Sequence, residues 1–398
     1  MKFSEMIEEY KQGKLSGEEA AALESDIEKH EAIADYIAER DDIGLHDLTL
    51  GSDPIGDEKA EAQDFTKKIR RQIRRSFLKA GLITGAIVLA AALFIMFALP
   101  GLVSKAYYDP TEVVKSYDSG ITVSRLDVDL AVYTELFVPE RIRQQSTANG
   151  EGYGNYSVFI PQVQSISGNF RDTAGFIKKG MISLYDPSLL KMPPVNCLEP
   201  MKAGLSGENL YESNWDFNAK EFIDYYPENG QRCVYVTLDH AMSYTEFEAW
   251  CRQNGVEPYW CAVCSGGKLL MPNPCGFLAC APVAFVGVSD EPIDKDYPLL
   301  TAADMLAKRS SEFSLSYGEN DVKQHLVSML SYAAEKNEGI TMLSGAEGIA
   351  AELREAAQKV EANGFEIYGF MICADKADAE RLTGLSGIVS MFNNGAAE

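Results

Sequence analysis

The stretch from Ala80 to Val103, AGLITGAIVLAAALFIMFALPGLV, contains no charged residue in 24 positions. A membrane-spanning helix needs roughly 20 apolar residues to cross a hydrocarbon layer about 30 Å thick. A buried core helix of this length would normally keep a polar face, and a cleaved signal peptide would be shorter and nearer the N-terminus. Only Pro100 interrupts the helical composition. The run therefore predicts a single transmembrane helix.

A dense basic cluster directly precedes this run. Its seven members are Lys67, Lys68, Arg70, Arg71, Arg74, Arg75 and Lys79. Basic residues that flank a span are retained on the cytoplasmic side, and they also attract anionic lipid headgroups. The cluster predicts a cell-membrane protein with a cytoplasmic N-terminus and an extracellular C-terminus. We expect no direct nucleic-acid binding, because these charges are already engaged at the membrane.

Apolar residues recur every four positions from Phe65 to Phe77, so we expect the basic segment to be helical and continuous with the span. This predicts four regions. They are a cytoplasmic helical domain at 1–42, an acidic linker at 43–66, a juxtamembrane and transmembrane helix at 67–103, and an extracytoplasmic α+β sensor domain at 104–398.

The formal net charge of −23 is unevenly distributed. Residues 1–66 contain 6 Lys or Arg against 19 Asp or Glu, a net charge of −13. A field of this sign repels nucleic acid and attracts basic protein partners.

Two short amphipathic helices are predicted in the first 40 residues. Ser16 and Glu19 form a capping box for the second helix, whose apolar face consists of Leu23, Ile27, His30, Ala34 and Ile37. Two helices of this size bury little between them. We therefore expect Leu23, Ile27, His30 and Ile37 to bind a partner.

The extracytoplasmic part has the pattern of an α+β domain. Residues from Tyr117 to Phe159 alternate as strands do, with turn-rich breaks such as TANGEGYGNY. A strand at 233–239 is then followed by a helix capped by Ser243 and ended by Asn254-Gly255, and by a second strand in VEPYWCAV. This order predicts a β-α-β unit.

A second unit lies near the C-terminus. Ser344 and Glu347 are expected to cap a helix that ends at Asn363-Gly364. A strand at 365–373, a short helix in KADAERLTG and a final strand in IVSMF follow. A helix is also expected around Val322 to Ala333. Together these elements predict a sheet with helices on one face, of the ferredoxin-like kind.

All eight cysteines lie in the part predicted to be extracytoplasmic, where an even number favours disulfides. The candidate disulfide cysteines are Cys251, Cys261, Cys264, Cys275 and Cys280. Cys261 and Cys264 are an odd number of residues apart, so on a regular strand they face opposite sides, and each pairs more easily with another cysteine.

The Cys261-x-x-Cys264 spacing also resembles a redox motif or half of a zinc site. The redox motif needs a helix N-terminus to lower the thiol pKa, whereas Gly266, Gly267 and later prolines break any helix here. The spacing of Cys275 and Cys280 is wide for a zinc ribbon. Motifs of hydrolases and phosphate-binding loops are absent from the sequence. We expect no catalytic site, no metal and no cofactor.

Several segments resemble known families. YKQGKLSGEEAAALESDIEKHEAIADYIAE resembles the cytoplasmic domain of membrane anti-sigma factors, many of which carry a His-x3-Cys-x2-Cys zinc motif. Asp26, His30 and Ile33 stand at the matching positions, and Ile cannot bind zinc. The resemblance therefore implies a domain of this type without its metal.

The segments YVTLDHAMSYTEFEAWCRQNGVEPYWCAV and EIYGFMICADKADAERLTGLSGIVSMF resemble the C-terminal domain of sigma factor regulators of Gram-positive bacteria. VYTELFVP and GYGNYSV fit the early part of that domain. The resemblance implies an anti-sigma factor that holds an extracytoplasmic-function sigma factor and senses an envelope signal. The alternatives are a membrane-anchored envelope binding or assembly module, and an extracytoplasmic thiol oxidoreductase that uses Cys261 and Cys264.

Overall fold

The computed structural model describes residues 10, 16–17, 20–29, 58–118, 120–143, 145–164, 170–207, 216–279, 292–306, 308, 315 and 317–394. The chain divides into two compact units, Met1–Gly85 and Ala86–Glu398, which we call the N-terminal and C-terminal units. In the N-terminal unit, residues 20–29 are helical, as predicted. His30, Ile33, Ile37 and the predicted acidic linker up to residue 57 lie outside the described residues.

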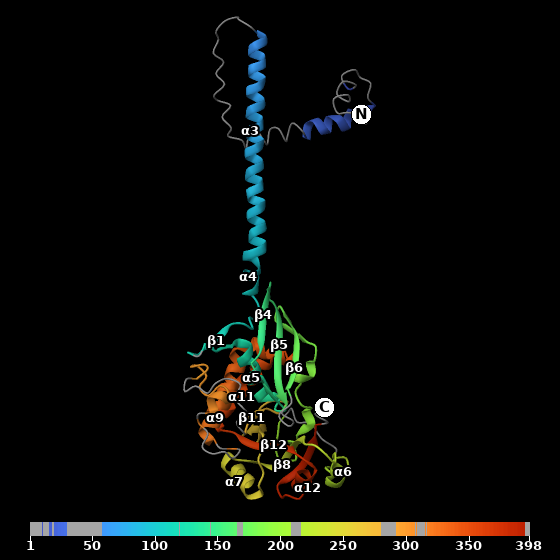
Figure 1. Cartoon of the computed structure of the whole chain (residues 1–398). Helices are drawn as coiled ribbons and strands as arrows, with labels where there is room; N and C mark the ends of the chain where they lie inside the picture. Colours follow the sequence, from blue (N-terminus) through green and yellow to red (C-terminus); the bar gives the residue numbers. More distant parts are fainter. Residues whose placement is uncertain are drawn as a thin grey trace. The chain divides into compact units, whose positions relative to one another are not determined.

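The basic cluster and the apolar run form one helical segment. Helix α3 (Glu58–Leu93) continues into the π-helical turn η2 (Phe94–Ala98) and helix α4 (Leu99–Ser104) (Figure 1). Its part from Lys67 to Ser104 is long and apolar enough to cross a membrane. Pro100 accounts for η2, because its ring clashes with the carbonyl of Met96 and a widened turn relieves the clash.

The larger sheet contains the two predicted β-α-β units. Its strands run in the order β10 (Lys268–Leu269), β9 (Trp260–Ser265), β12 (Glu366–Ala374), β8 (Arg232–Met242) and β13 (Ile388–Asn393), with β11 (Gly276–Leu278) paired to β9. Helices α7 (Tyr244–Asn254) and α12 (Lys376–Thr383) connect β8 to β9 and β12 to β13. The two strands joined by α7 lie on either side of β12, and the two joined by α12 lie on either side of β8. In both cases the middle strand is antiparallel to its neighbours. This is the β-α-β-β-α-β arrangement.

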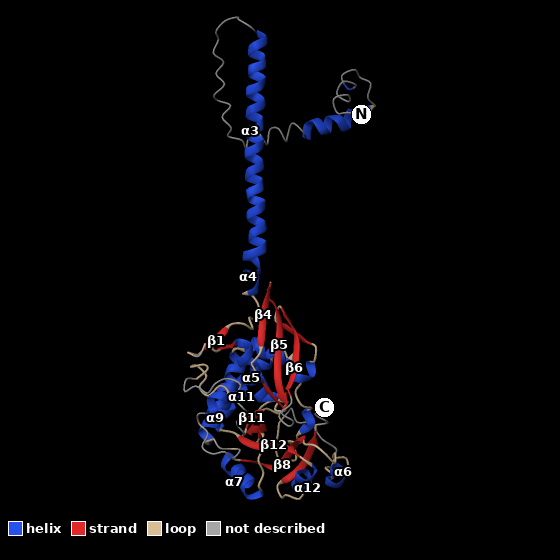
Figure 2. Ribbon diagram, viewed as in Figure 1, coloured by secondary structure: helices blue, strands red, loops and turns tan. Residues whose placement is uncertain are grey.

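The helices cover one face of this sheet. Val234, Val236 and Leu238 of β8 point into the main core with residues of α7, α12 and the helices inserted before β12. Those inserted helices are α8 (Ala302–Leu306), α9 (Glu319–Glu335), α10 (Asn337–Ser344) and α11 (Ile349–Asn363). Helices α9 and α11 pack against each other (Figure 2). Cys233 and Tyr235 point to a smaller core on the opposite face. The segment between η3 (Pro187–Leu190) and helix α6 (Ala219–Asp224) covers that face. It contains η4 (Val195–Cys197).

A second sheet precedes the first along the chain. It contains β3 (Arg141–Arg143), β5 (Asn155–Gln164), β6 (Phe170–Lys178) and β7 (Met181–Leu184) in that order, with β4 (Thr147–Gly152) also paired to β5. A separate pair is formed by β1 (Val113–Ser116) and β2 (Thr122–Ser124). The stretch TANGEGYGNY, which we expected to be a break between strands, instead forms the end of the β4–β5 hairpin.

One predicted strand region is a helix. Residues expected to alternate as a strand form α5 (Arg125–Phe137), which begins with a capping box between Ser124 and Asp127. The helix is buried on nearly all sides, so it has no polar stripe. The buried residues Asp127 and Asp129 alternate with apolar residues, which produces the sequence pattern of a strand.

A predicted helix start is also wrong. Ser344 ends α10 rather than capping α11, whose N-cap is Gly348. Gly345 adopts a left-handed backbone with φ of 66° and separates the two helices, a conformation that glycine adopts without steric cost.

Candidate functional site

Helix α5 carries three buried acidic side chains that bind different parts of the C-terminal unit. Asp127, Asp129 and Glu135 are each at most 6% exposed. Asp127 caps its own helix and accepts hydrogen bonds from the backbone and hydroxyl of Ser146. Buried carboxylates are costly unless they are paired, so α5 depends on partners that reach it from distant segments.

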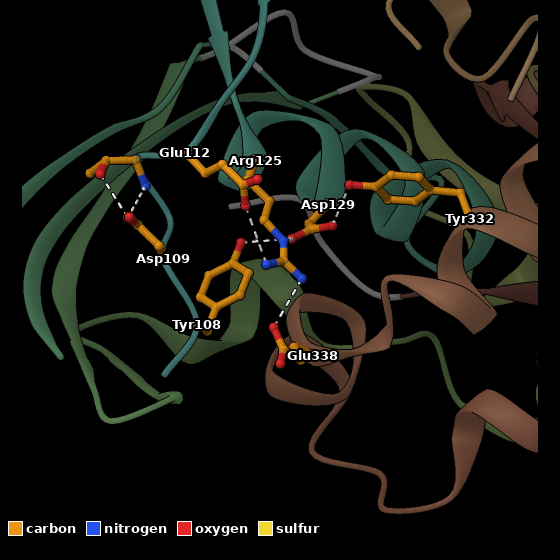
Figure 3. Close-up of polar contacts among 8 residues, drawn as sticks. Tyr108, Asp109, Glu112, Arg125, Asp129, Tyr332 and Glu338 are labelled. Atoms are coloured by element: carbon orange, nitrogen blue, oxygen red, sulfur yellow. Dashed lines mark hydrogen bonds and ion pairs between the residues drawn. The ribbon is translucent and has the colours of Figure 1, made fainter. Parts of the chain in front are cut away.

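Asp129 is held by two tyrosine hydroxyls. Tyr108 donates to Oδ2 over 2.7 Å and Tyr332 donates to Oδ1 over 2.8 Å (Figure 3). Tyr108 follows α4 and Tyr332 belongs to α9, so one carboxyl joins the segment after the apolar helix to the helical layer of the main core. Burial raises the pKa of Asp129 to about 6, although both hydroxyls and Arg125 act in the opposite direction.

Arg125 extends this cluster to the protein surface. Its Nε lies 3.9 Å from Asp129, and its two terminal nitrogens pair with Glu112 at 3.4 Å and Glu338 at 3.0 Å. The guanidinium also stacks over the ring of Tyr108, 5.0 Å from its centroid. Arg125 therefore ties residues 108–112 to α5 and to the first turn of α10.

Glu135, two turns further along α5, forms a second buried pair. Its Oε1 lies 2.8 Å from His325 Nε2 of α9 and accepts the N–H of Leu278 in β11 over 3.1 Å. Its backbone carbonyl accepts the indole N–H of Trp260 in β9. Desolvation lowers the pKa of His325, but the charge and hydrogen bond of Glu135 outweigh it and the net shift is upward. This pair fixes α5 against both α9 and the larger sheet.

The tip of the β4–β5 hairpin closes on the end of the apolar helix (Figure 1). Ser104 Oγ accepts the N–H of Gly154 over 2.9 Å, and the Tyr153 hydroxyl donates to the carbonyl of Ile95. Gly152, Tyr153 and Gly154 all have positive φ. A side-chain carbon at Gly154 would lie 2.6 Å from the ring of Tyr107, so this tight contact requires glycine.

An open, mainly apolar cavity of about 690 Å³ lies beside the same helices. Tyr133 of α5 and Leu343 of α10 line it together with residues of the 187–195 segment, such as Leu190 and Met192. Its volume is in the range of small-molecule sites. Helix α10 also carries Glu338 and Gly339, which lie at the Asp129 cluster. A displacement of α10 by a molecule in this cavity would therefore act directly on that cluster.

The predicted partner-binding residues are only partly described. Leu23 is 1% exposed and Ile27 is half-buried within helix 20–29, whereas His30 and Ile37 lie outside the described residues. The seven basic residues of the predicted anchor are all exposed along α3. Sigma factor binding by Leu23, Ile27, His30 and Ile37 stays a prediction.

The predicted disulfide cysteines are dispersed. No disulfide joins any two of the seven described cysteines, and Cys280 lies outside the described residues. Cys251, Cys261 and Cys275 point into the main core, whereas Cys264 points to the smaller one. Cys261 and Cys264 thus face opposite sides of β9, in agreement with their odd spacing. Pairing among these five cysteines stays a prediction.

The structure also bears on the redox reading of Cys261-x-x-Cys264. Cys261 lies within a fully buried strand rather than at a helix N-terminus, so no helix dipole stabilises its thiolate. Burial raises the pKa of Cys264, and it raises that of Cys275 to about 12.

The Asp129 cluster was not found from the sequence. Tyr108 and Tyr332 lie 21 and 203 residues from Asp129 along the chain, and no local pattern relates them. One signal was available, because Ser124 and Asp127 have the Ser-x-x-Asp spacing of a capping box ahead of an apolar run. It would have identified α5 as a helix.

Comparison with known proteins gives one match. Residues 224–391 match a family model described as sigma factor regulator C-terminal. No curated protein matches the chain, and no solved structure does. The matched region contains the larger sheet and helices α7 to α12, with Tyr332, Glu338 and His325. Tyr108, Arg125, Asp129 and Glu135 precede it, so the buried clusters connect the matched region to the segment that follows the apolar helix.

Proposed function

We propose that the chain, whose residues 224–391 match the sigma factor regulator C-terminal family model, is a single-pass membrane anti-sigma factor for an extracytoplasmic-function sigma factor. The observation that carries this proposal is the presence, in one chain with that region, of an apolar helix of membrane-spanning length preceded by seven basic residues. By the positive-inside rule residues 1–66 are cytoplasmic, and residues 104–398 are extracellular.

The cytoplasmic segment is the sigma-binding part. Its net charge of −13 complements the basic surfaces with which sigma factors contact DNA and RNA polymerase, and such complementarity speeds association. Leu23, Ile27, His30 and Ile37 supply the apolar face, with no zinc and no direct contact to nucleic acid. Occupying those surfaces keeps the sigma factor away from the polymerase.

The C-terminal unit is the sensor of an envelope signal. A change in the larger sheet or in α10 reaches the end of the apolar helix by two routes. One is the Tyr108–Asp129–Tyr332 hydrogen bonds, and the other is the contact of the β4–β5 hairpin with η2 and α4. Both routes end within ten residues of Ser104. The apolar helix then carries the change across the membrane to the sigma-binding segment.

Transcript levels in the source cell test this function. Replacing the chain by its Ile27→Asp variant should raise the transcripts of one sigma-dependent gene set several-fold, because a charge on the binding face releases the sigma factor. Glu28→Gln is the matched control, since Glu28 is exposed on the same helix. If Ile27→Asp is present in the membrane at normal abundance and no gene set responds, the proposal is wrong.

An envelope binding or assembly module is the second candidate, and the 690 Å³ cavity favours it. In that case the C-terminal unit would act alone and residues 1–66 would be dispensable. A cell whose chain lacks residues 1–57 would then behave as the wild type does, whereas an anti-sigma factor truncated in this way loses its regulation.

A further inference from the structure

Two cysteines outside the predicted set lie directly opposite each other in the larger sheet. Cys233 of β8 is the register partner of Cys373 of β12. The carbonyl of Cys233 accepts the N–H of Asn394, so the backbone polar groups of Cys233 point toward β13. The carbonyl of Met371 accepts the N–H of Tyr259, so the backbone polar groups of Met371 point toward β9. Cys373 is two residues further along the same strand, so its backbone polar groups point in the same direction.

The two cysteines therefore form a non-hydrogen-bonded pair of the β8–β12 ladder. In such pairs the Cα atoms are about 4.5 Å apart and the side chains approach most closely. Disulfides span Cα separations of about 4.4 to 6.8 Å. The Cα separation typical of such a pair thus falls within the range that a disulfide between Cys233 and Cys373 requires.

Each of the two thiols shifts the pKa of the other. A hydrogen bond from Cys233 lowers the pKa of Cys373, whereas the pKa of Cys233 is raised by the same contact and by burial. Cys373 is also the one cysteine among the seven described that is not fully buried. Burial raises the pKa of four others, Cys197, Cys251, Cys264 and Cys275. Cys373 thus combines partial exposure with a lowered thiol pKa, and both favour reactivity in a cysteine.

Arg141 and Glu140 both act on the pair. The charge of Arg141 lowers the pKa of Cys233, and its Nη1 is buried with no hydrogen-bond partner among the described residues. The charge of Glu140 raises the pKa of both thiols. Its Oε1 accepts hydrogen bonds from Tyr235 and Asn394. Glu140, Arg141, Tyr235 and Asn394 also line a cavity of about 220 Å³.

We propose that Cys233 and Cys373 are the oxidation site of this protein, which a disulfide-bearing oxidant converts into an intramolecular disulfide between β8 and β12. The Cys373 thiolate attacks one sulfur of the oxidant, whose S–S bond breaks and releases one thiolate. The Cys233 sulfur then attacks the Cys373 sulfur of the mixed disulfide and releases the second. The two cysteines lose two electrons and two protons, and the oxidant becomes two thiols. This inference is independent of sigma factor binding.

Disulfide mapping on the full chain tests the proposal. The chain in detergent micelles is reduced, treated with glutathione disulfide, alkylated and digested with trypsin. Cleavage after Arg232, Arg252, Lys359 and Lys376 yields peptides 233–252 and 360–376, which should be recovered linked to each other. Peptide 233–252 also contains Cys251, so Cys251→Ser is the matched control. The linked species should persist in Cys251→Ser and disappear in Cys233→Ser and Cys373→Ser.

Recovery of alkylated, unlinked Cys373 after oxidation of the wild type would overturn the proposal, as would a link that survives Cys233→Ser. Alkylation of the reduced, folded wild type adds a readout that needs no variant. Cys373 should react with iodoacetamide at least roughly tenfold faster than Cys233 and Cys251, a difference that unfolding abolishes. Equal rates in the folded chain would contradict the assignment of Cys373 as the attacking thiol.

Discussion

The hydroxyl of Tyr108 lies 2.7 Å from Oδ2 of Asp129, and through it the segment that follows the apolar helix is bound to the buried helix α5. The other oxygen of the same carboxyl is bound to Tyr332, within the region that matches the sigma factor regulator C-terminal model. One side chain thus couples the segment that follows the apolar helix to the rest of the C-terminal unit.

Tyr108→Phe should lower the free energy of unfolding of the C-terminal unit by about 1–3 kcal/mol, because it leaves a buried acceptor of Asp129 without one of its donors. Urea unfolding followed by tryptophan fluorescence measures this, since all three tryptophans lie in that unit. Tyr107→Phe is the control, because Tyr107 is 36% exposed and next in sequence. Equal effects of the two variants would show that the hydroxyl of Tyr108 has no special role.

The stability of the C-terminal unit should contain a contribution that falls with rising pH. Burial raises the pKa of Asp129 from 3.8 to about 6, so between these values the folded state binds more protons than the unfolded state. The contribution is fully present below about pH 4 and is lost as the pH rises through about 6, and it amounts to about 3 kcal/mol.

Asp129→Asn isolates this contribution, because it removes the titrating group and keeps a side chain of similar shape. The difference in unfolding free energy between wild type and Asp129→Asn, measured from pH 4 to pH 7, should change in the stated direction and level off above pH 6. A constant difference over that range would mean that Asp129 titrates normally.

Gly339→Ala should destabilise the C-terminal unit although alanine is the better helix former. A methyl group at this position of α10 would lie 2.0 Å from Oδ2 of Asp129, and such overpacking costs about 1–3 kcal/mol. Gly384→Ala is the matched control, since its nearest neighbour would be the Arg381 carbonyl at an ordinary 3.5 Å. The melting temperatures of the two variants are compared, and that of Gly339→Ala should be the lower. Equal melting temperatures would contradict the close approach of α10 to Asp129.

His325→Ala should cost about 3–5 kcal/mol, because it leaves the buried carboxyl of Glu135 without the imidazole that pairs with it. His240→Ala removes a histidine that pairs with Asp239 at the surface, where ion pairs contribute at most about 1 kcal/mol. Chemical denaturation of both variants provides the comparison. A small loss in His325→Ala would indicate that Glu135 is satisfied by the backbone N–H of Leu278 alone.

The elements with local signals were predicted well. Strand alternation, the Ser243 cap and the Asn254-Gly255 ending are all short-range patterns, and they located β8, α7 and β9 within a few residues. The same holds for the final β-α-β unit. Helix α5 was mistaken for strands, because a helix buried on nearly all sides lacks the polar stripe that a sequence pattern detects.

The contacts that couple distant segments could not be predicted in this way. Tyr108, Asp129 and Tyr332 meet only because α5 packs against α9 in the completed fold, and Cys233 meets Cys373 because β12 inserts between β8 and β9. A sequence shows each residue separately, whereas strand order decides which of them become neighbours.

Co-purification of the sigma factor is the most direct test of the account. The tagged full chain is solubilised from membranes of the source cell, and its bound proteins are identified by mass spectrometry, in parallel with Ile27→Asp and Glu28→Gln. The account predicts that one extracytoplasmic-function sigma factor is captured by the wild type and by Glu28→Gln and is lost from Ile27→Asp. Absence of any sigma factor from the wild-type sample, or equal capture by all three chains, would contradict the proposed function of the N-terminal unit.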